Sequence, residues 1–171
     1  MAPRTTAFSS YLTYLMIYNE TTGVADWQRL VNIKSLPDLG GSPEQLETTT
    51  LSNAMNTYCS GIQSFDSLTF TCNYTKGQYD NVKIVADGKT TFSYAVFIGD
   101  DSTGEDGTFY FNGVASIAKT GVGVNEVQEM TLTIAPATDI TNTAPTGAAL
   151  KGVDTTKTGY TSWVAATDSD S

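Results

Sequence analysis

A segment of about thirty residues, 35–64, reads SLPDLGGSPEQLETTTLSNAMNTYCSGIQS and has no repeating apolar pattern. It lies between two stretches whose alternating apolar residues are typical of β-strands. Compact domains usually join their elements with roughly 4 to 6 residues, so a connection this long either carries a function or contradicts the strands on both sides of it. Its apolar residues, such as Leu36, Leu46 and Leu51, are spaced too irregularly to form a buried face. Exposed apolar groups of this kind commonly mark a partner surface.

The remainder of the chain is dominated by strand patterns. The clearest is at 68–75, where Leu68, Phe70 and Cys72 alternate with threonine and asparagine. Such alternation indicates a strand with one buried and one solvated face. The pattern predicts six strands, at residues 11–18, 26–34, 68–75, 90–99, 108–119 and 127–135.

One helix is predicted, at residues 77–88, because Tyr79, Val82 and Ala86 have helical spacing and Gly88 is a natural helix terminator. Six strands and one helix predict a mainly β fold, a small β-sandwich or barrel with a flanking helix. From Ala137 onward large apolar residues become rare. We therefore expect a β-sandwich domain at 1–136, which includes the long loop 35–64, and an extended C-terminal arm at 137–171.

The composition disfavours several classes of function. The chain has no histidine, so Ser-His-Asp triads, Cys-His dyads and histidine-containing zinc sites are excluded. Its formal net charge of −9 disfavours anchoring to nucleic-acid phosphates. The two cysteines, Cys59 and Cys72, are too few for a disulfide framework, and the sequence leaves open whether they pair. No run approaches the roughly 18 consecutive apolar residues of a membrane span, so we expect no membrane association.

Two acidic groups could carry chemistry, but each has a simpler interpretation. The loop 100–106 is acidic enough for calcium, yet the twelfth position from its start is Phe111 instead of glutamate, which favours a solvated hairpin tip. Glu44 and Glu47 are the close pair that a glycosidase needs. The residues 42–44, Ser-Pro-Glu, are instead typical of a first helical turn. We therefore expect no catalytic residue, no metal, no cofactor and no enzyme activity.

Several motifs of the chain occur together, in this order, in one known family. LPDLGGSPEQLETTTLSN, then TYCSGIQS, then LTFTCNY resemble the major tail tube proteins of siphophages and related prophages, especially those of Gram-positive hosts. The similarity is strong over residues 33–74. It continues more loosely through the predicted helix and through GVNEVQEMTLTIAPATDI.

The resemblance implies a structural protein of the virion tail. Its subunits would form hexameric rings that stack into a hollow tube, and the tube would conduct DNA from the capsid to the host. The loop 35–64 would reach the adjacent subunit or ring, and terminal arms would help to join successive rings. The implied assembly contacts are Leu36, Pro37, Asp38, Leu39, Glu44, Glu47, Thr50 and Leu51.

The same resemblance implies further partners. These are the tape measure protein, tail terminator and tip proteins, and double-stranded DNA that passes without specific binding, with assembly in the host cytoplasm. An acidic lining would repel phosphates and so allow fast passage. We expect a disproportionate share of the excess acid to face the bore. Glu129 is a candidate because it lies on the polar face of a predicted strand.

Two alternatives remain open at this point. A tube subunit of a contractile device, such as a tailocin or a type VI secretion tube, has a related fold and would be recognised by its contacts with a sheath. An extracellular β-sandwich binding module, such as an adhesin, would explain the threonine and aromatic content but requires an export signal. The apolar run 11–18 is a poor signal, because Asn19 and Glu20 follow it in place of small residues.

Overall fold

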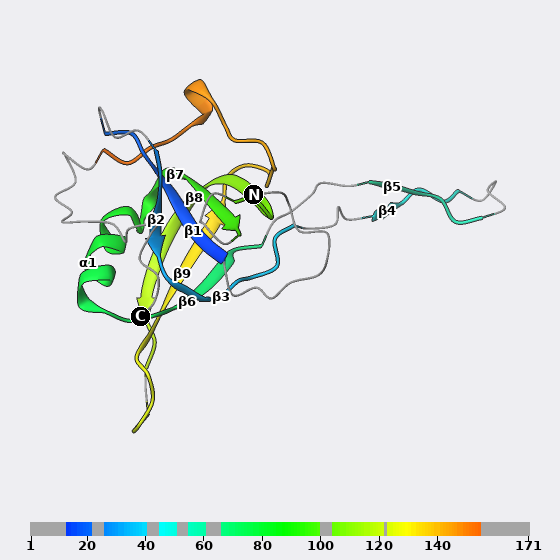
Figure 1. Ribbon diagram of the computed structural model, residues 1–171. Helices are drawn as coiled ribbons and strands as arrows, with labels where there is room; N and C mark the ends of the chain where they lie inside the picture. Colours follow the sequence, from blue (N-terminus) through cyan, green and yellow to red (C-terminus); the bar gives the residue numbers. More distant parts are fainter. Residues whose placement is uncertain are drawn as a thin grey trace.

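A computed structural model describes residues 13–21, 26–40, 45–50, 55–60, 66–99, 104–121 and 123–154. These residues form a mainly antiparallel β fold with one α-helix, α1 (Lys76–Val85), and one short 3₁₀ turn, η1 (Gly147–Ala149) (Figure 1). The strands are β1 (Thr13–Asn19), β2 (Asp26–Val31), β3 (Ile33–Ser35), β4 (Gln45–Glu47), β5 (Tyr58–Ser60), β6 (Leu68–Asn73), β7 (Asp87–Ile98), β8 (Gly107–Lys119) and β9 (Glu129–Pro136). The predicted fold class is confirmed.

The predicted elements are present, with one strand divided and two added. The strand expected at 26–34 breaks at Asn32 into β2 and β3. The strands β4 and β5 lie inside the segment 35–64, where the sequence predicted no element. Each is only three residues long, which is too short for alternation to be detected. The helical turn that Ser-Pro-Glu at 42–44 indicated does not continue into a helix, because residues 45–47 are extended and paired as β4.

Seven of the strands form one sheet in the order β2-β1-β7-β8-β9-β6-β3. The strands β2 and β3 stand at opposite edges of this sheet, although only Asn32 separates them in the chain. The two edges must therefore lie next to each other. The sheet coils into a flattened barrel, and the chain crosses from one edge to the other at Asn32 (Figure 1).

The long strand β8 turns a second corner of the barrel. Its first part pairs with β7 and its second part with β9. The two ladders overlap from Gly113 to Ser116, and Gly113 faces Phe92 on one side and Pro136 on the other. A Cβ atom added to Gly113 would lie 2.7 Å from Ile134 Cγ2 and 2.8 Å from the Ala135 carbonyl oxygen. Glycine therefore permits the close approach of β8 and β9 at this corner.

The inside of the barrel is a single apolar core. Alternate residues of the strands point inward, including Phe70, Tyr94 and Phe111, which are at most 2% exposed. The helix α1 adds Val82 and Val85 to this core. Its first turn is capped by the Thr75 side chain, which accepts a hydrogen bond from the Gln78 amide.

An aromatic layer covers the outer face of β1, β2 and β7. The Trp27 ring lies 5.4 Å from Tyr18, 6.2 Å from Phe97 and 5.3 Å from Tyr110, measured between ring centroids. Met16 beneath it is 2% exposed. This face of the barrel is therefore largely removed from water.

The segment 137–154 follows β9 and runs along the barrel. Thr141 exchanges two backbone hydrogen bonds with Tyr110, and further along the Ser93 amide donates to the Lys151 carbonyl oxygen at 2.7 Å. The buried Ser93 hydroxyl donates to Asn112 Oδ1 at 2.6 Å, and Asn112 Nδ2 donates to the Ala149 carbonyl oxygen at 2.7 Å. The described part of the predicted arm thus bonds to its own barrel. Residues 155–171 lie outside the described residues, so the predicted division at 136 stays a prediction.

In the described part of the chain, no helix is long and apolar enough to cross a membrane.

Substituting alanine at two glycines tests the barrel corner. We expect Gly113→Ala to lower the free energy of unfolding by about 1–3 kcal/mol, because the added methyl group meets Ile134 and the β9 backbone. Gly77→Ala is the matched control. No atom lies within 4 Å of a Cβ at Gly77 in α1, so the same change should raise stability by up to about 1 kcal/mol. Urea denaturation measures both, and equal effects would contradict the crowded corner.

Candidate assembly surfaces

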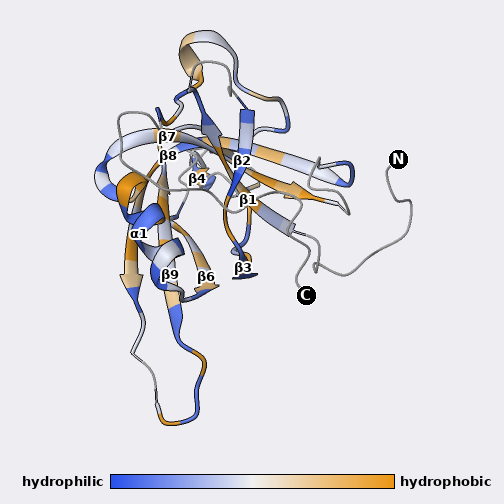
Figure 2. Cartoon of the chain, turned by 60° about the vertical axis from the view of Figure 1, so that its left-hand side comes forward, coloured by the Kyte–Doolittle hydropathy of each residue, from blue (hydrophilic) through white to orange (hydrophobic). Residues whose placement is uncertain are grey.

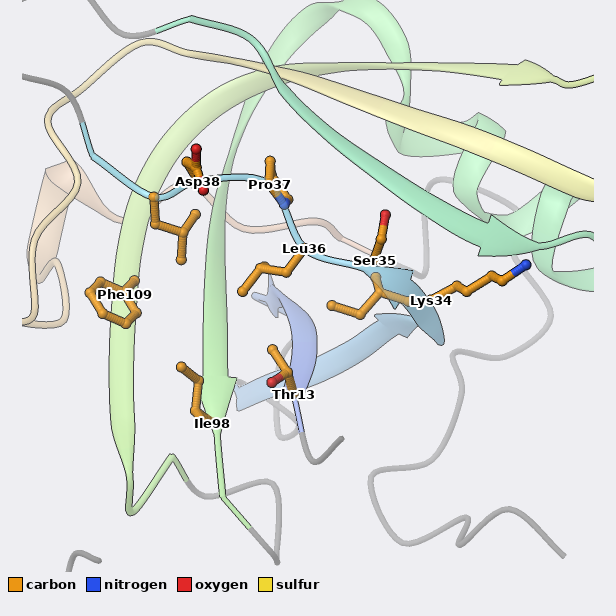
Figure 3. Close-up of a pocket in the computed structure, with 10 residues that line it drawn as sticks. Thr13, Lys34, Ser35, Leu36, Pro37, Asp38, Ile98 and Phe109 are labelled. Carbon is orange, nitrogen blue, oxygen red and sulfur yellow. The ribbon is translucent and has the colours of Figure 1, made fainter. Parts of the chain in front are cut away.

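The root of the long segment lines a groove on the barrel. Residues 36–39 form one wall, and Thr13, Ile98 and Phe109 come from β1, β7 and β8 (Figure 3). The groove has a volume of about 790 Å³. Leu36 and Leu39 are half-buried and pack against the core, whereas Asp38 is exposed. Part of the predicted interface therefore also anchors the long segment to its own domain.

Beyond this root, β4 and β5 form a separate two-stranded hairpin in which Gln45–Glu47 pairs with Tyr58–Ser60. We call this hairpin, with its described residues 45–50 and 55–60, the arm. It projects away from the barrel (Figure 1). The Thr48 amide donates to the Thr57 carbonyl oxygen at 2.8 Å and extends the pairing toward the tip. An isolated two-stranded hairpin is marginally stable in water. Contact with a partner would therefore stabilise the arm.

The arm exposes large apolar side chains. Leu46 is 48% exposed, Met55 77% and Tyr58 55%. Glu47 and Thr50, two of the predicted contact residues, are exposed on the same arm. Glu44 and Leu51, the other two predicted there, lie outside the described residues.

A second hairpin, formed by β8, β9 and the residues 120–128 between them, extends beyond the barrel. Its hydrophobic positions are seen at and near the tip in Figure 2. Val124 is 92% exposed and Val127 67%. The sequence analysis did not identify this hairpin as a contact element. Three valines in a short glycine-containing stretch, GVGVNEV, are the signal that could have found it.

The outer face of β6, β9 and the second half of β8 carries threonine and serine side chains that lie next to one another across the strands. Thr69 pairs across with Thr133, and Thr133 pairs with Ser116. In the next row Thr71 pairs with Thr131. In this hydroxyl face (Thr69, Thr71, Ser116, Thr131 and Thr133), Thr69 and Ser116 are exposed and the other three residues are half-buried.

Glu129, the predicted lumen residue, is half-buried at the end of the hydroxyl face. Its carboxylate forms an ion pair with Lys34, which reaches across from β3. The charge of Glu129 is therefore balanced locally. The other acidic residues of the described chain lie mostly in loops and at element ends, as Asp38, Asp66 and Asp106 do.

The described residues contain no group of three or more side chains suited to hold a metal ion. The calcium alternative falls partly on residues 100–103, which lie outside the described residues. Its described part, Glu105 and Asp106, forms a turn in which the Asp106 amide donates to the Ile98 carbonyl oxygen at 3.0 Å.

The two cysteines are both free thiols in very different surroundings. Cys59 is exposed on the arm, and Cys72 is fully buried in β6. Burial disfavours the charged thiolate and raises the pKa of Cys72 to about 12. The pairing that the sequence left open is absent from this structure.

Alkylation at pH 8 should therefore label one thiol of the native protein. Cys59 reacts because it is accessible, and Cys72 does not, because its raised pKa keeps it protonated and the core shields it. Mass spectrometry counts the labels. A Cys59→Ser variant should take none when native and one after unfolding. Two labels on the native wild type would refute the buried position of Cys72.

Comparisons with known proteins agree with this architecture. The family model for the phage tail tube protein (TTP) matches residues 15–145. A search of curated proteins gives no significant match.

Several solved structures share the fold at low sequence identity. The tail of an empty gene transfer agent particle, refined with C6 symmetry, has a TM-score of 0.59 and 14% identity, covering 81% of this chain and 100% of that one. The sheath/tube terminator of an extracellular contractile injection system gives 0.61 and 12%, covering 81% and 98%. The tube-terminating cap of the anti-feeding prophage gives 0.60 and 12%, covering 82% and 93%.

At these identities the structural matches show the fold alone, whereas the family model spans most of the chain, from within β1 to the segment that follows β9. This chain belongs to the phage tail tube protein family.

Proposed function

We propose that the chain is the tube subunit of a long non-contractile phage tail. Six copies form a ring, rings stack into a hollow tube, and double-stranded DNA passes through the bore. The protein resides in the virion tail and assembles in the host cytoplasm. The observation that carries this proposal is the arm, which exposes Leu46, Met55 and Tyr58 away from the barrel.

The arm finds its partner in a second copy of the chain. Apolar side chains on a projecting hairpin gain from burial against a neighbour, at roughly 25 cal/mol per Å² of apolar surface. Ordering the arm on a neighbour also supplies the stability that a lone hairpin lacks. The proposed contacts are those predicted from the sequence, namely Leu36, Pro37, Asp38, Leu39, Glu44, Glu47, Thr50 and Leu51, together with Leu46, Met55 and Tyr58.

The edge of the sheet offers a second means of joining neighbours in the ring. The strand β3 pairs with β6 only at Cys72 and Thr71, so the described ladder does not reach the start of β6 at Leu68. An edge of this kind accepts a strand from another chain. Pairing around a closed ring then leaves no exposed edge.

The hydroxyl face is proposed to line the bore. It presents hydroxyl groups to solvent, whereas the aromatic layer presents apolar rings. Its hydroxyl groups carry no charge. Beside it Lys34 and Glu129 neutralise each other, and Asp87, which pairs with Ser116 across the β7–β8 ladder, adds a negative charge. A surface without free cations does not bind the phosphates of a passing duplex. The sequence prediction that excess acid faces the bore, with Glu129 as candidate, stays a prediction.

The ends and the interior of the tube require other proteins. The tube-terminating cap and the sheath/tube terminator share the fold of this chain, which supports the proposal that a related subunit can close the tube. A tape measure protein occupying the bore during assembly, and tip proteins at the far end, complete the proposed set of partners.

A tube subunit of a contractile system is the second candidate. It is favoured by the two similar structures that come from contractile systems, the extracellular injection system and the anti-feeding prophage. In such a system the outside of the tube contacts a sheath. Co-purification of a sheath protein with tubes of this chain would select this candidate over the non-contractile tail.

Negative-stain electron microscopy over a range of protein concentrations tests the proposed function. We expect rings or hollow tubes for the wild type. Leu46→Asp should raise the concentration at which assemblies first appear by at least about tenfold, since about 1.4 kcal/mol per contact gives that factor. Gln45→Asp is the matched control, because it adds the same charge at an exposed neighbouring position of β4. A wild type that stays monomeric at every concentration, or equal onsets for both variants, would refute the role of the arm.

A further inference from the structure

We infer that the β8–β9 hairpin is the axial connector of the tube. Its tip, with Val124 and Val127, docks onto a second copy of the chain in the neighbouring ring. The inference rests on the proposed function, since it assumes stacked rings. It goes beyond that function because it assigns the contact between rings to an element that the predicted contact residues do not include.

The distribution of exposed apolar side chains singles out this hairpin. Among the described residues, five large hydrophobic side chains are exposed, and all of them lie on the two projecting hairpins. Three belong to the arm. The other two are Val124 and Val127, at 92% and 67% exposure. Apolar groups confined to projections that leave the barrel mark contact surfaces.

The hairpin is held in a fixed direction by its stem. The Lys34–Glu129 ion pair ties it to β3, and the Lys119 ammonium lies 4.6 Å from the centroid of the Tyr74 ring. The Tyr74 amide also donates to the Gln128 carbonyl oxygen at 2.8 Å. A stem braced in this way loses little freedom on docking, which favours binding.

The tip itself has a defined turn. The Gly123 amide donates to a Glu126 carboxylate oxygen at 2.8 Å. Asn125 adopts a positive φ of 64°, a conformation that asparagine tolerates well. Val124 lies within this turn and Val127 directly follows it, so a defined turn presents both side chains.

The direction of the hairpin favours a contact between rings over one within a ring. Strands β8 and β9 carry the hydroxyl face, which is the proposed bore lining. Strands that line a barrel tilt by about 35–45° from its axis, so their continuation beyond the ring enters the neighbouring ring. The arm leaves the barrel in a different direction (Figure 1). A tube needs two unlike contacts, one that closes a ring and one that repeats without closing, and two hairpins in different directions suit this need.

The receiving surface on the next copy is the groove beside residues 36–39. It is lined by Leu36, Leu39, Ile98 and Phe109, and Figure 3 shows Leu36, Ile98 and Phe109 around the same hollow. It lies where β8 begins, whereas the hairpin lies where β8 ends. From Phe109 to Lys119 about ten residues at roughly 3.3 Å each separate the two along the strand. Tip and groove are therefore different surfaces of one subunit, as a head-to-tail contact requires.

Removing the apolar tip tests the inference. The Val124→Ser/Val127→Ser double variant should still form rings, but its onset concentration for tubes should rise at least about tenfold. Gly121→Ser is the matched control, because it adds the same side chain to the same loop where no atom lies within 4 Å of a new Cβ. Electron microscopy and sedimentation measure rings and tubes, and a thermal melt checks that the barrel is intact.

Each outcome separates the inference from the proposed function. Tubes of the double variant at the wild-type onset overturn the inference and leave the proposed function in place. A folded double variant that forms neither rings nor tubes also overturns it, because the hairpin would then act within the ring. A wild type without rings or tubes overturns both.

Crosslinking tests the groove without relying on a loss of assembly. In a Cys59→Ser background, Val124→Cys combined with Pro37→Cys should give disulfide-linked ladders from assembled tubes on a non-reducing gel. Val124→Cys combined with Thr143→Cys is the control pair and should give none. Ladders from the control pair alone, or from neither pair in intact tubes, overturn the assignment of the groove.

Discussion

The closure of the sheet at Asn32 is the constraint on which the rest of the structure depends. Because Val31 and Ile33 belong to opposite edges of a seven-stranded sheet, the sheet has to coil until those edges meet. Its inner face is then filled by residues of the strands and α1. The long segment starts just after this crossing point. Of the described residues of this segment, Leu36 and Leu39 at its root pack against the core, and the arm extends away from the barrel.

The same closure gives the barrel two unlike outer surfaces. One is an aromatic layer around Trp27, beside which the segment 137–154 is bonded through Ser93 and Asn112. The other is the hydroxyl face, which is polar and reached by solvent and which has no unpaired lysine or arginine among its five residues. The difference matters for a conduit, since bound phosphates would slow a passing duplex and free cations would bind them. On this face Lys34 and Glu129 are paired and Asp87 beside Ser116 adds a negative charge, whereas the acidic bore expected from the sequence stays a prediction.

The sequence predicted the elements whose signal is local and missed those that depend on distant partners. Alternation in 68–75 and helical spacing in 77–88 each lie within a few residues, and both elements are confirmed. The break at Asn32, the short strands of the arm and the pairing of Lys34 with Glu129 each depend on residues far away in the chain. The packing of Leu36 and Leu39 could not be predicted for the same reason. Their groove is completed by residues of β7 and β8, which come much later in the chain. The family resemblance correctly indicated a tail tube protein, while the host and the kind of tail are finer than the family match.

A helical reconstruction of the assembled tube by cryo-electron microscopy tests most directly whether the long segment is completed by a second copy. The proposed architecture predicts that the arm, with Leu46 and Tyr58, is buried on a neighbouring subunit while the hydroxyl face around Thr133 lines the bore. A tube in which the arm folds back onto its own barrel, or in which the aromatic layer faces the bore, would contradict it.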